Sequence, residues 1–309
     1  MQTLSPDAFQ HAKRYLFTHG RPLEQMLFEW HFEYGTTYDV LKALKRFQNK
    51  NGGFGHALEP DLHTPVSSVL ATITALKIMC SVEAHPNESV VEGAIGYLLN
   101  AYNEQKDLWE IIPPEANDAP RAFWWDYDSI HENFRGCQIN PRADVLGYLH
   151  HFSSLVNPAF LAQVTRAFLT ILDAIPAPLD MHEMTCLAHF AETENIPNNI
   201  RDTLHAKLAE SAPDVILIDP AKWHEYGLTP GAAAPTPHSA LVPHIPAQAM
   251  QAYLDYEIKT QQEDGSWPVT WSWEVLDPDA WAEAKKAWQS VITLEKLLLL
   301  NHWGRIAER

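Results

Sequence analysis

The sequence predicts an all-α protein built from helical hairpins. Apolar residues recur at spacings of three and four along most of the chain, and the alternation of a half-buried strand is hard to find. Several of the 22 prolines stand at or beside the first residue of a periodic segment, where a helix tolerates proline. Because no glycine–serine linker divides the chain, we expect one domain over residues 1–309.

Four helices are predicted in the first quarter of the chain. A serine cap at Ser5, followed by proline, is typical of a helix start, and Gly20 ends that helix. Pro22 opens the second helix, and the third is predicted over residues 37–48. The fourth, over residues 66–79, is apolar on almost all sides, which predicts burial on most of its surface.

The rest of the chain continues the pattern. Further helices are predicted over residues 88–102, 141–152, 158–172, 179–191, 200–210, 246–262 and 280–301. Long and short connections alternate almost throughout, and the long ones are residues 49–64, 105–140, 212–245 and 264–279. Because alternate connections in a stack of hairpins lie at opposite ends, we expect the four long loops to gather at one end, where binding residues are usually held.

Composition narrows the classes of function. The chain has 39 acidic residues against 22 Lys and Arg, a net charge of −17, which disfavours nucleic-acid binding and polybasic membrane binding. Its three cysteines are too widely spaced for a disulfide framework or a Cys-x-x-Cys zinc site. There is no signal-peptide core and no apolar run of about 18 residues, so the sequence predicts a cytoplasmic protein without an integral membrane segment.

A repeat supports the hairpin architecture. Residues 41–54 and 254–267 each contain a helix end, a glutamine, an Asn/Asp-Gly turn, a small residue and an aromatic residue. The matched residues are Gln48 and Gln261, Gly52 and Gly265, and Phe54 and Trp267. We expect the glycine to take left-handed backbone, the glutamine to bond carbonyl groups at the helix end, and the aromatic residue to fill space between hairpins. A degenerate third copy lies at residues 97–109, with Asn103 in place of the glutamine; two unrelated helix ends are the alternative interpretation.

This repeat resembles that of squalene/hopene cyclases and protein prenyltransferase β subunits, the terpenoid cyclase-like α/α toroids. Residues 48–54 and 261–267 carry the resemblance, and residues 52–62 are similar to segments of bacterial proteins of similar length. The resemblance implies a single α/α toroid over residues 1–309, with about six helical hairpins in inner and outer rings. The inner helices would be 66–79, 141–152, 179–191 and 280–301.

The activity of these families does not follow from the fold alone. The Asp-x-Asp-Asp acid motif of class II cyclases is absent from this chain, as is the Asp-Asp-x-x-Asp metal motif of class I enzymes. The sequence therefore assigns no metal ligand and indicates no cofactor.

The long loops concentrate acidic, histidine and aromatic residues. Candidate catalytic acids are Asp61, Glu59, Asp126 and Asp128. Candidate substrate-binding residues are His56, His63, Trp124, Trp125, His131, Trp223, Tyr226, Trp267, Trp271, Trp273 and Glu274. Aromatic faces stabilise carbocations and stack on sugars, and a buried carboxyl acts as a general acid toward an alkene or a glycosidic oxygen. Glu59 and Asp61 are favoured because they precede a predicted inner helix, whose N-terminus attracts anions; the alternative is that one of them caps this helix.

Three functions stay open at this point. The favoured one is an enzyme acting on an apolar or isoprenoid-like substrate by cation chemistry in an aromatic, acid-lined cavity. The second is a carbohydrate-active α/α-barrel hydrolase or lyase, and the third is a non-catalytic toroid that binds a ligand or peptide. All three imply a small-molecule or peptide partner rather than a nucleic acid, and they leave the oligomeric state open.

Overall fold

A computed structural model describes residues 2–308 of the chain. Helices take up 62% of the chain and strands 4%, which confirms the predicted all-α class. The chain divides into two compact units: unit 1 consists of Met1–Ala43 and Ala212–Arg309, and unit 2 of Leu44–Ser211. The single toroid over residues 1–309 stays a prediction.

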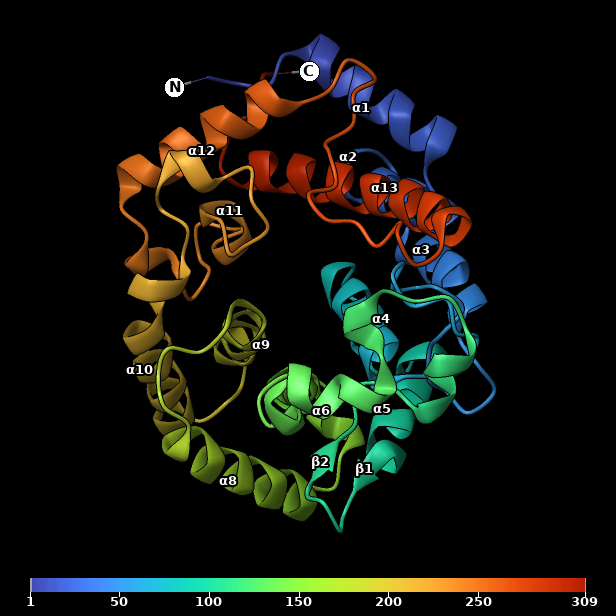
Figure 1. Cartoon of the computed structure of the whole chain (residues 1–309), viewed down its shortest axis with the longest axis vertical. Coiled ribbons are helices and arrows are strands. Elements are labelled where there is room, and N and C mark those ends of the chain that lie inside the picture. The colour runs from blue at the N-terminus through green and yellow to red at the C-terminus, as the bar shows by residue number, and fades with distance from the viewer. Residues whose placement is uncertain (1, 309) are drawn as a thin grey trace. The chain divides into compact units, whose positions relative to one another are not determined.

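Unit 1 combines the two ends of the chain. Its helices are α1 (Pro6–His19), α2 (Pro22–Phe32), most of α3 (Thr37–Leu44), α11 (Pro230–Ala233), α12 (Ala247–Thr260) and α13 (Pro278–His302), with short 3-10 turns at Pro220–Lys222 and Val242–His244. The long helix α13 packs against α1 and α2, and α11 packs against α12 (Figure 1). Ser5 caps α1 by accepting a hydrogen bond from the Ala8 N–H, as predicted.

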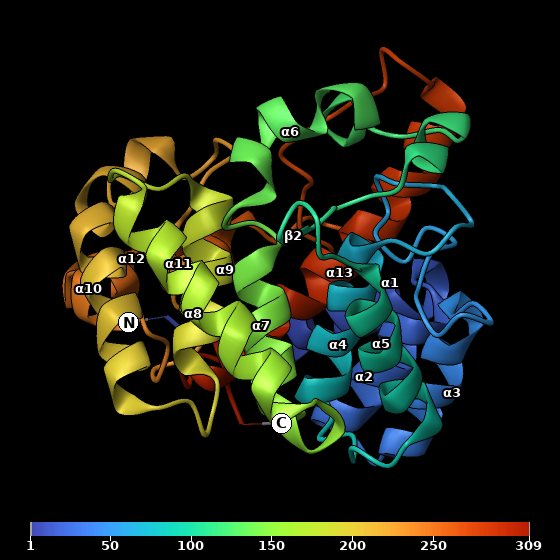
Figure 2. The same cartoon turned by 90° about the horizontal axis from the view of Figure 1, so that it is seen from below.

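Unit 2 is formed by the middle of the chain. Its helices are α4 (Val69–Ser81), α5 (Ser89–Ala101), α6 (Ile130–Asn133), α7 (Arg142–His151), α8 (Pro158–Ala174), α9 (Met181–Glu192) and most of α10 (Asn198–Val215). Short 3-10 turns lie at Lys45–Phe47, Pro114–Asp118, Phe123–Trp125, Tyr127–Ser129, Arg135–Cys137 and Ser153–Leu155. The antiparallel strands β1 (Tyr102–Asn103) and β2 (Leu108–Trp109) pair Tyr102 with Trp109. Helix α7 packs against α4, α8 and α9 (Figure 2).

All eleven predicted helices are present, with ends shifted by a few residues. Helix α4 was expected from residue 66 and begins at Val69, because Ser68 caps it and the Ser68 N–H donates to the carbonyl oxygen of Phe54 (2.9 Å). The segment 105–140, expected as a loop, contains β2, α6 and several 3-10 turns. These elements are too short to show a periodicity in the sequence.

The turn after α3 has the left-handed glycine and the buried aromatic residue predicted for the repeat, but its glutamine does not bond the carbonyl groups of its own helix end as expected. The side-chain amide of Gln48 donates to the carbonyl oxygens of Gly52 (2.8 Å) and of Val90 in α5 (3.0 Å). Gly52 has a φ of 87°. Phe54 is fully buried, and its N–H donates to Oγ1 of Thr72 in α4 (3.1 Å). The turn therefore fastens the end of one helix to two later helices.

The turn after α12 repeats these contacts in unit 1. Gln261 donates to the carbonyl oxygens of Gly265 (3.0 Å) and of Ala8 in α1 (2.9 Å), and Gly265 has a φ of 93°. Trp267 is buried, and its N–H donates to Oγ1 of Thr293 in α13 (3.3 Å). The two segments are therefore copies of one structural motif rather than unrelated helix ends.

The degenerate third copy keeps part of this motif. Asp107 takes the place of the glycine and has a positive φ of 53°. The indole N–H of Trp109 donates to the carbonyl oxygen of Leu98 in the preceding helix (2.7 Å), as that of Trp267 does to Glu257 (2.9 Å). The third copy therefore has the left-handed turn and the buried indole of the motif, although it lacks the glutamine and the glycine.

Two predictions from composition can be compared with the structure. All three cysteines are free, as expected. Within residues 2–308, no helix combines the length and the apolar character that crossing a bilayer requires.

Candidate functional site

The first two long loops meet in unit 2. Leu62 and Arg121 form an antiparallel bridge between them. On either side of this bridge, the His63 N–H donates to the carbonyl oxygen of Pro120 (3.0 Å), and the Ala122 N–H donates to that of Asp61 (2.9 Å). Side chains more than 50 residues apart in the sequence are thereby held together in one site.

Two of the candidate acids are buried in this site. Glu59 is 7% exposed and Asp61 is 2% exposed. Oε1 of Glu59 accepts a long hydrogen bond of 3.4 Å from the indole N–H of Trp125. The Trp125 ring stacks on Phe134, with ring centroids 5.1 Å apart and planes 5° from parallel. Glu59 therefore lies beside an aromatic pair and largely away from water.

The other two candidate acids have different surroundings. Oδ2 of Asp126 lies 2.6 Å from the Arg121 guanidinium, and this hydrogen bond holds the pKa of Asp126 below its usual range. Oδ1 of Asp126 accepts a hydrogen bond from the Asp128 N–H (3.0 Å), which caps a short turn, and Asp128 itself is exposed. The lowered pKa makes Asp126 a poor proton donor, because a carboxyl that stays ionised has no proton to give.

The two candidate histidines of the first loop hold that loop in place. Nε2 of His56 lies 3.0 Å from Oδ1 of Asn49, and Nε2 of His63 lies 3.0 Å from the carbonyl oxygen of Pro60. His56 and Ala57 have positive φ angles of 56° and 57°. Consecutive left-handed residues other than glycine carry backbone strain, which clusters at functional sites in proteins.

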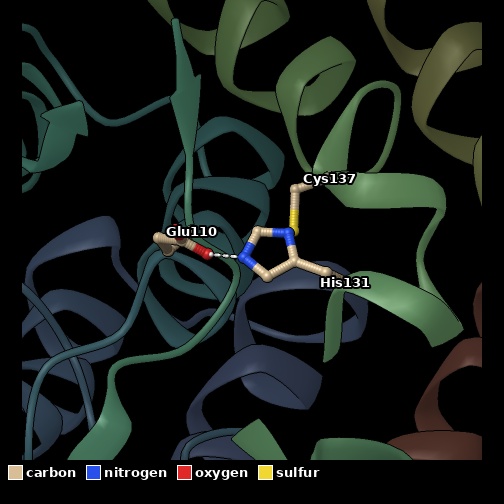
Figure 3. Close-up of side chains that lie close together, drawn as sticks. All are labelled: Glu110, His131 and Cys137. Carbon is tan, nitrogen blue, oxygen red and sulfur yellow. Dashed lines mark ion pairs between the residues drawn. The ribbon is translucent and has the colours of Figure 1, made fainter. Parts of the chain in front are cut away.

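A second group of side chains meets within the second long loop, residues 105–140, in unit 2 (Figure 3). Glu110 follows β2, His131 lies on α6, and Cys137 ends a 3-10 turn. One potential ligand atom from each of the three lies within 4.8 Å of the others. Nε2 of His131 is 2.8 Å from Oε2 of Glu110, and Figure 3 shows the sulfur of Cys137 beside the same imidazole ring. Sequence reasoning found only His131, because the spacing of the three matches no local metal motif.

The backbone at Cys137 is unusual. Arg135, Gly136 and Cys137 have φ angles of 45°, 64° and 59°, three consecutive residues in the left-handed region. Nε of Arg135 is 2.8 Å from Oε1 of the buried Glu183, which holds this turn against α9. Burial raises the pKa of the Cys137 thiol to about 11, although a hydrogen bond from the Ile111 N–H opposes this shift.

In unit 1, the candidate aromatic residues divide into buried and accessible groups. Trp223, Trp267 and Trp273 are at most 5% exposed and pack in the core. Tyr226 is exposed and meets Trp271 edge to face, with ring centroids 5.6 Å apart. This contact joins the third and fourth long loops. Trp124 in unit 2 is partly exposed, and Glu274 in unit 1 is exposed.

Comparisons of the chain with protein-family models, curated proteins and solved structures find no match.

Proposed function

We propose that the protein is an enzyme that acts on an apolar, isoprenoid-like substrate, with Glu59 as the proton donor and Trp125 and Phe134 as the aromatic wall. The observation that carries this proposal is a carboxyl 7% exposed whose oxygen contacts the indole of a stacked aromatic pair. Asp61, which is even less exposed, is the second acid of the site.

The chemistry of an alkene supports this assignment. An alkene is a very weak base, so its protonation needs an acid that keeps its proton until the substrate arrives. Removal of a carboxyl from water favours the protonated form, and the faces of Trp and Phe rings stabilise a neighbouring cation. In the proposed step, the Glu59 proton passes to an alkene carbon, and the proton later lost by the cation restores a neutral carboxyl.

The proposed fold is a single terpenoid cyclase-like α/α toroid with inner and outer rings of helices. Its support is the motif shared by the turns after α3 and α12, which ties a helix end to other helices in both units. As parts of the same proposal, the protein works in the cytoplasm on a small molecule and does not bind nucleic acid.

The proposal is tested by deuterium incorporation. The purified chain is incubated in D2O with farnesol, geranylgeraniol and squalene, and the products are analysed by mass spectrometry. We expect a product with one deuterium on carbon, lost in Glu59→Gln and retained in Glu88→Gln, which replaces an exposed acid of the same unit. The rate should fall by at least about 100-fold, the usual scale of general acid catalysis.

The same experiment, run in parallel with oligosaccharides as substrates, separates the alternatives. Equal deuterium incorporation in Glu59→Gln would remove this residue from the acid role. Cleavage of oligosaccharides without turnover of any isoprenoid would favour the carbohydrate-active enzyme instead. Binding of an isoprenoid without any product would favour the non-catalytic protein.

A further inference from the structure

Three chemically different metal-binding side chains converge in unit 2. Glu110 offers a carboxylate oxygen, His131 an imidazole nitrogen and Cys137 a sulfur, all within 4.8 Å of one another. We propose that these three side chains bind one zinc-class divalent cation. This site does not involve Glu59 and does not rest on the proposed function.

The distances are compatible with one ion. Zinc binds sulfur at about 2.3 Å and nitrogen or oxygen at about 2.0–2.2 Å, so a tetrahedral site separates its ligand atoms by roughly 3.3–3.8 Å. Nε2 of His131 and Oε2 of Glu110 are 2.8 Å apart and would move apart slightly, and no two ligand atoms of the group are more than 4.8 Å apart. Figure 3 shows Glu110 at one ring nitrogen of His131 and the sulfur of Cys137 beside the other, so the partly exposed imidazole must turn before one ion can contact all three donors.

The surrounding structure holds each ligand in position. Nζ of Lys106 lies 2.9 Å from Oε1 of Glu110, which leaves Oε2 directed at His131. The left-handed turn at Arg135–Cys137 carries the cysteine, and a hydrogen bond from the Ile111 N–H reaches its sulfur. Such contacts with groups outside the ligand set commonly orient ligands in metal sites.

Accessibility favours a metal site over a nucleophilic cysteine. A thiol beside an imidazole that contacts a carboxylate is also the arrangement of a nucleophilic cysteine with its general base. Cys137, however, is fully buried and out of reach of a substrate. The side chains of His131 and Glu110 are 43% and 21% exposed, so a small cation can enter from their side. Three protein ligands with a fourth position open to solvent are typical of catalytic zinc.

The donor set selects among cations. Calcium and magnesium require oxygen ligands, whereas one thiolate, one imidazole and one carboxylate suit zinc or cobalt(II). Two negative charges, from the thiolate and the carboxylate, balance the charge of a divalent ion. Because cobalt(II) suits the same three ligands, it is a direct probe of the site. Cobalt(II) absorbs visible light, and it forms a thiolate charge-transfer band only when a thiolate binds it.

The test uses the full chain without a histidine tag, stripped with a chelator and then titrated with zinc chloride or cobalt chloride. We expect about one zinc per chain by elemental analysis, and with cobalt a thiolate charge-transfer band together with the visible bands of a tetrahedral ion. Cys137→Ser should abolish the charge-transfer band, while Cys80→Ser and Cys186→Ser, which replace the other two free cysteines, should retain it. Glu110→Gln and His131→Asn should weaken zinc binding at least about tenfold.

The outcomes decide the proposal. Absence of the thiolate band in the wild-type chain, or its persistence in Cys137→Ser, would overturn it. Because a buried cysteine variant can fail to fold, circular dichroism is recorded for each variant, and the partly exposed Glu110 and His131 give independent answers. Unchanged zinc affinity in both of these variants would also contradict the site, because zinc would then bind at other members of the chain's 16 histidines.

Discussion

At the scale of single residues, neighbouring loops place two carboxyls in different surroundings. Glu59 is buried beside an indole, whereas Asp126 is bound by a guanidinium that holds its pKa below the usual range. The sequence could place both acids in long loops, since acidic and aromatic residues cluster there. It could not assign them different roles, because the Arg121 partner and the Trp125 contact depend on how the loops fold against each other.

His31 predicts a pH dependence of stability. Burial, with a contribution from the charge of His302, lowers the pKa of His31 from 6.5 to about 4. The unfolded chain therefore binds a proton at His31 at a higher pH than the folded chain does, and the free energy of unfolding should fall as the pH drops from about 6.5 to about 4.

The measurement is urea unfolding across this pH range. His31→Phe, which keeps an aromatic ring but cannot titrate, should flatten the decrease relative to the wild type. The carboxyls that titrate in the same pH range affect both proteins equally, so the difference between their unfolding free energies reports His31 alone. Identical slopes would show that the folded protein does not resist protonation of His31.

At the scale of elements, the repeated turn is the feature that sequence reasoning predicted most completely. The left-handed glycine, the glutamine amide and the buried aromatic all recur after α3 and α12. These features are local, because the chemistry of a tight turn is set by a few adjacent residues. The glutamine's second partner, Val90 in one copy and Ala8 in the other, is not local and appears only in the fold.

Gly265 gives a prediction at this scale with a matched control. A Cβ at Gly265 would lie 2.3 Å from the backbone carbon of His11, whereas a Cβ at Gly304 would meet nothing within 4 Å, and both glycines have positive φ. Gly304→Ala should cost about 1–2 kcal/mol of unfolding free energy, the cost of left-handed backbone alone. Gly265→Ala should cost more, because α1 must also move; equal losses would argue against this close contact. Thermal and urea unfolding provide the measurement.

The proposed metal-binding cluster of Glu110, His131 and Cys137 was not predicted, although all three residues lie within one long loop. Of its members, the sequence identified His131 as a substrate-binding candidate and did not single out Glu110 or Cys137. Metal motifs can be found in a sequence when helix or turn geometry fixes the spacing of the ligands. Here a strand end, the short helix α6 and a left-handed turn bring the ligands together, and none of these has a sequence periodicity.

At the scale of the whole molecule, the two ends of the chain contribute to the same unit. Leu4 and Ile306 form a parallel bridge, and the Leu4 N–H donates to the carbonyl oxygen of Arg305 (2.7 Å). The buried Arg305 guanidinium also binds the carbonyl oxygen of Gln2 and the side chain of Asp255 in α12. Unit 1 therefore contains direct contacts between residues near the two ends of the chain.

Arg305 should accordingly stabilise the protein through these contacts between the two ends of the chain. Arg305→Met keeps much of the side-chain volume but removes the bonds to Gln2 and Asp255, and should lower the free energy of unfolding by about 2–4 kcal/mol. Arg166→Met, at an exposed position of α8, should change it by less than about 0.5 kcal/mol. A loss no larger than that of the control would mean that the side-chain bonds of Arg305 do not stabilise the protein.

The sequence by itself determined the all-α class, the eleven main helices and the repeated turn, because helix periodicity, caps and turn residues act between neighbours in the chain. It also identified the loops that carry the acids and aromatic residues. Only the tertiary structure decided which of these side chains meet: the contact of Glu59 with Trp125, and the group of Glu110, His131 and Cys137. The first contact joins two loops far apart in sequence and the second joins separate parts of one long loop, and both form only when the packing of the surrounding helices has fixed the path of the loops.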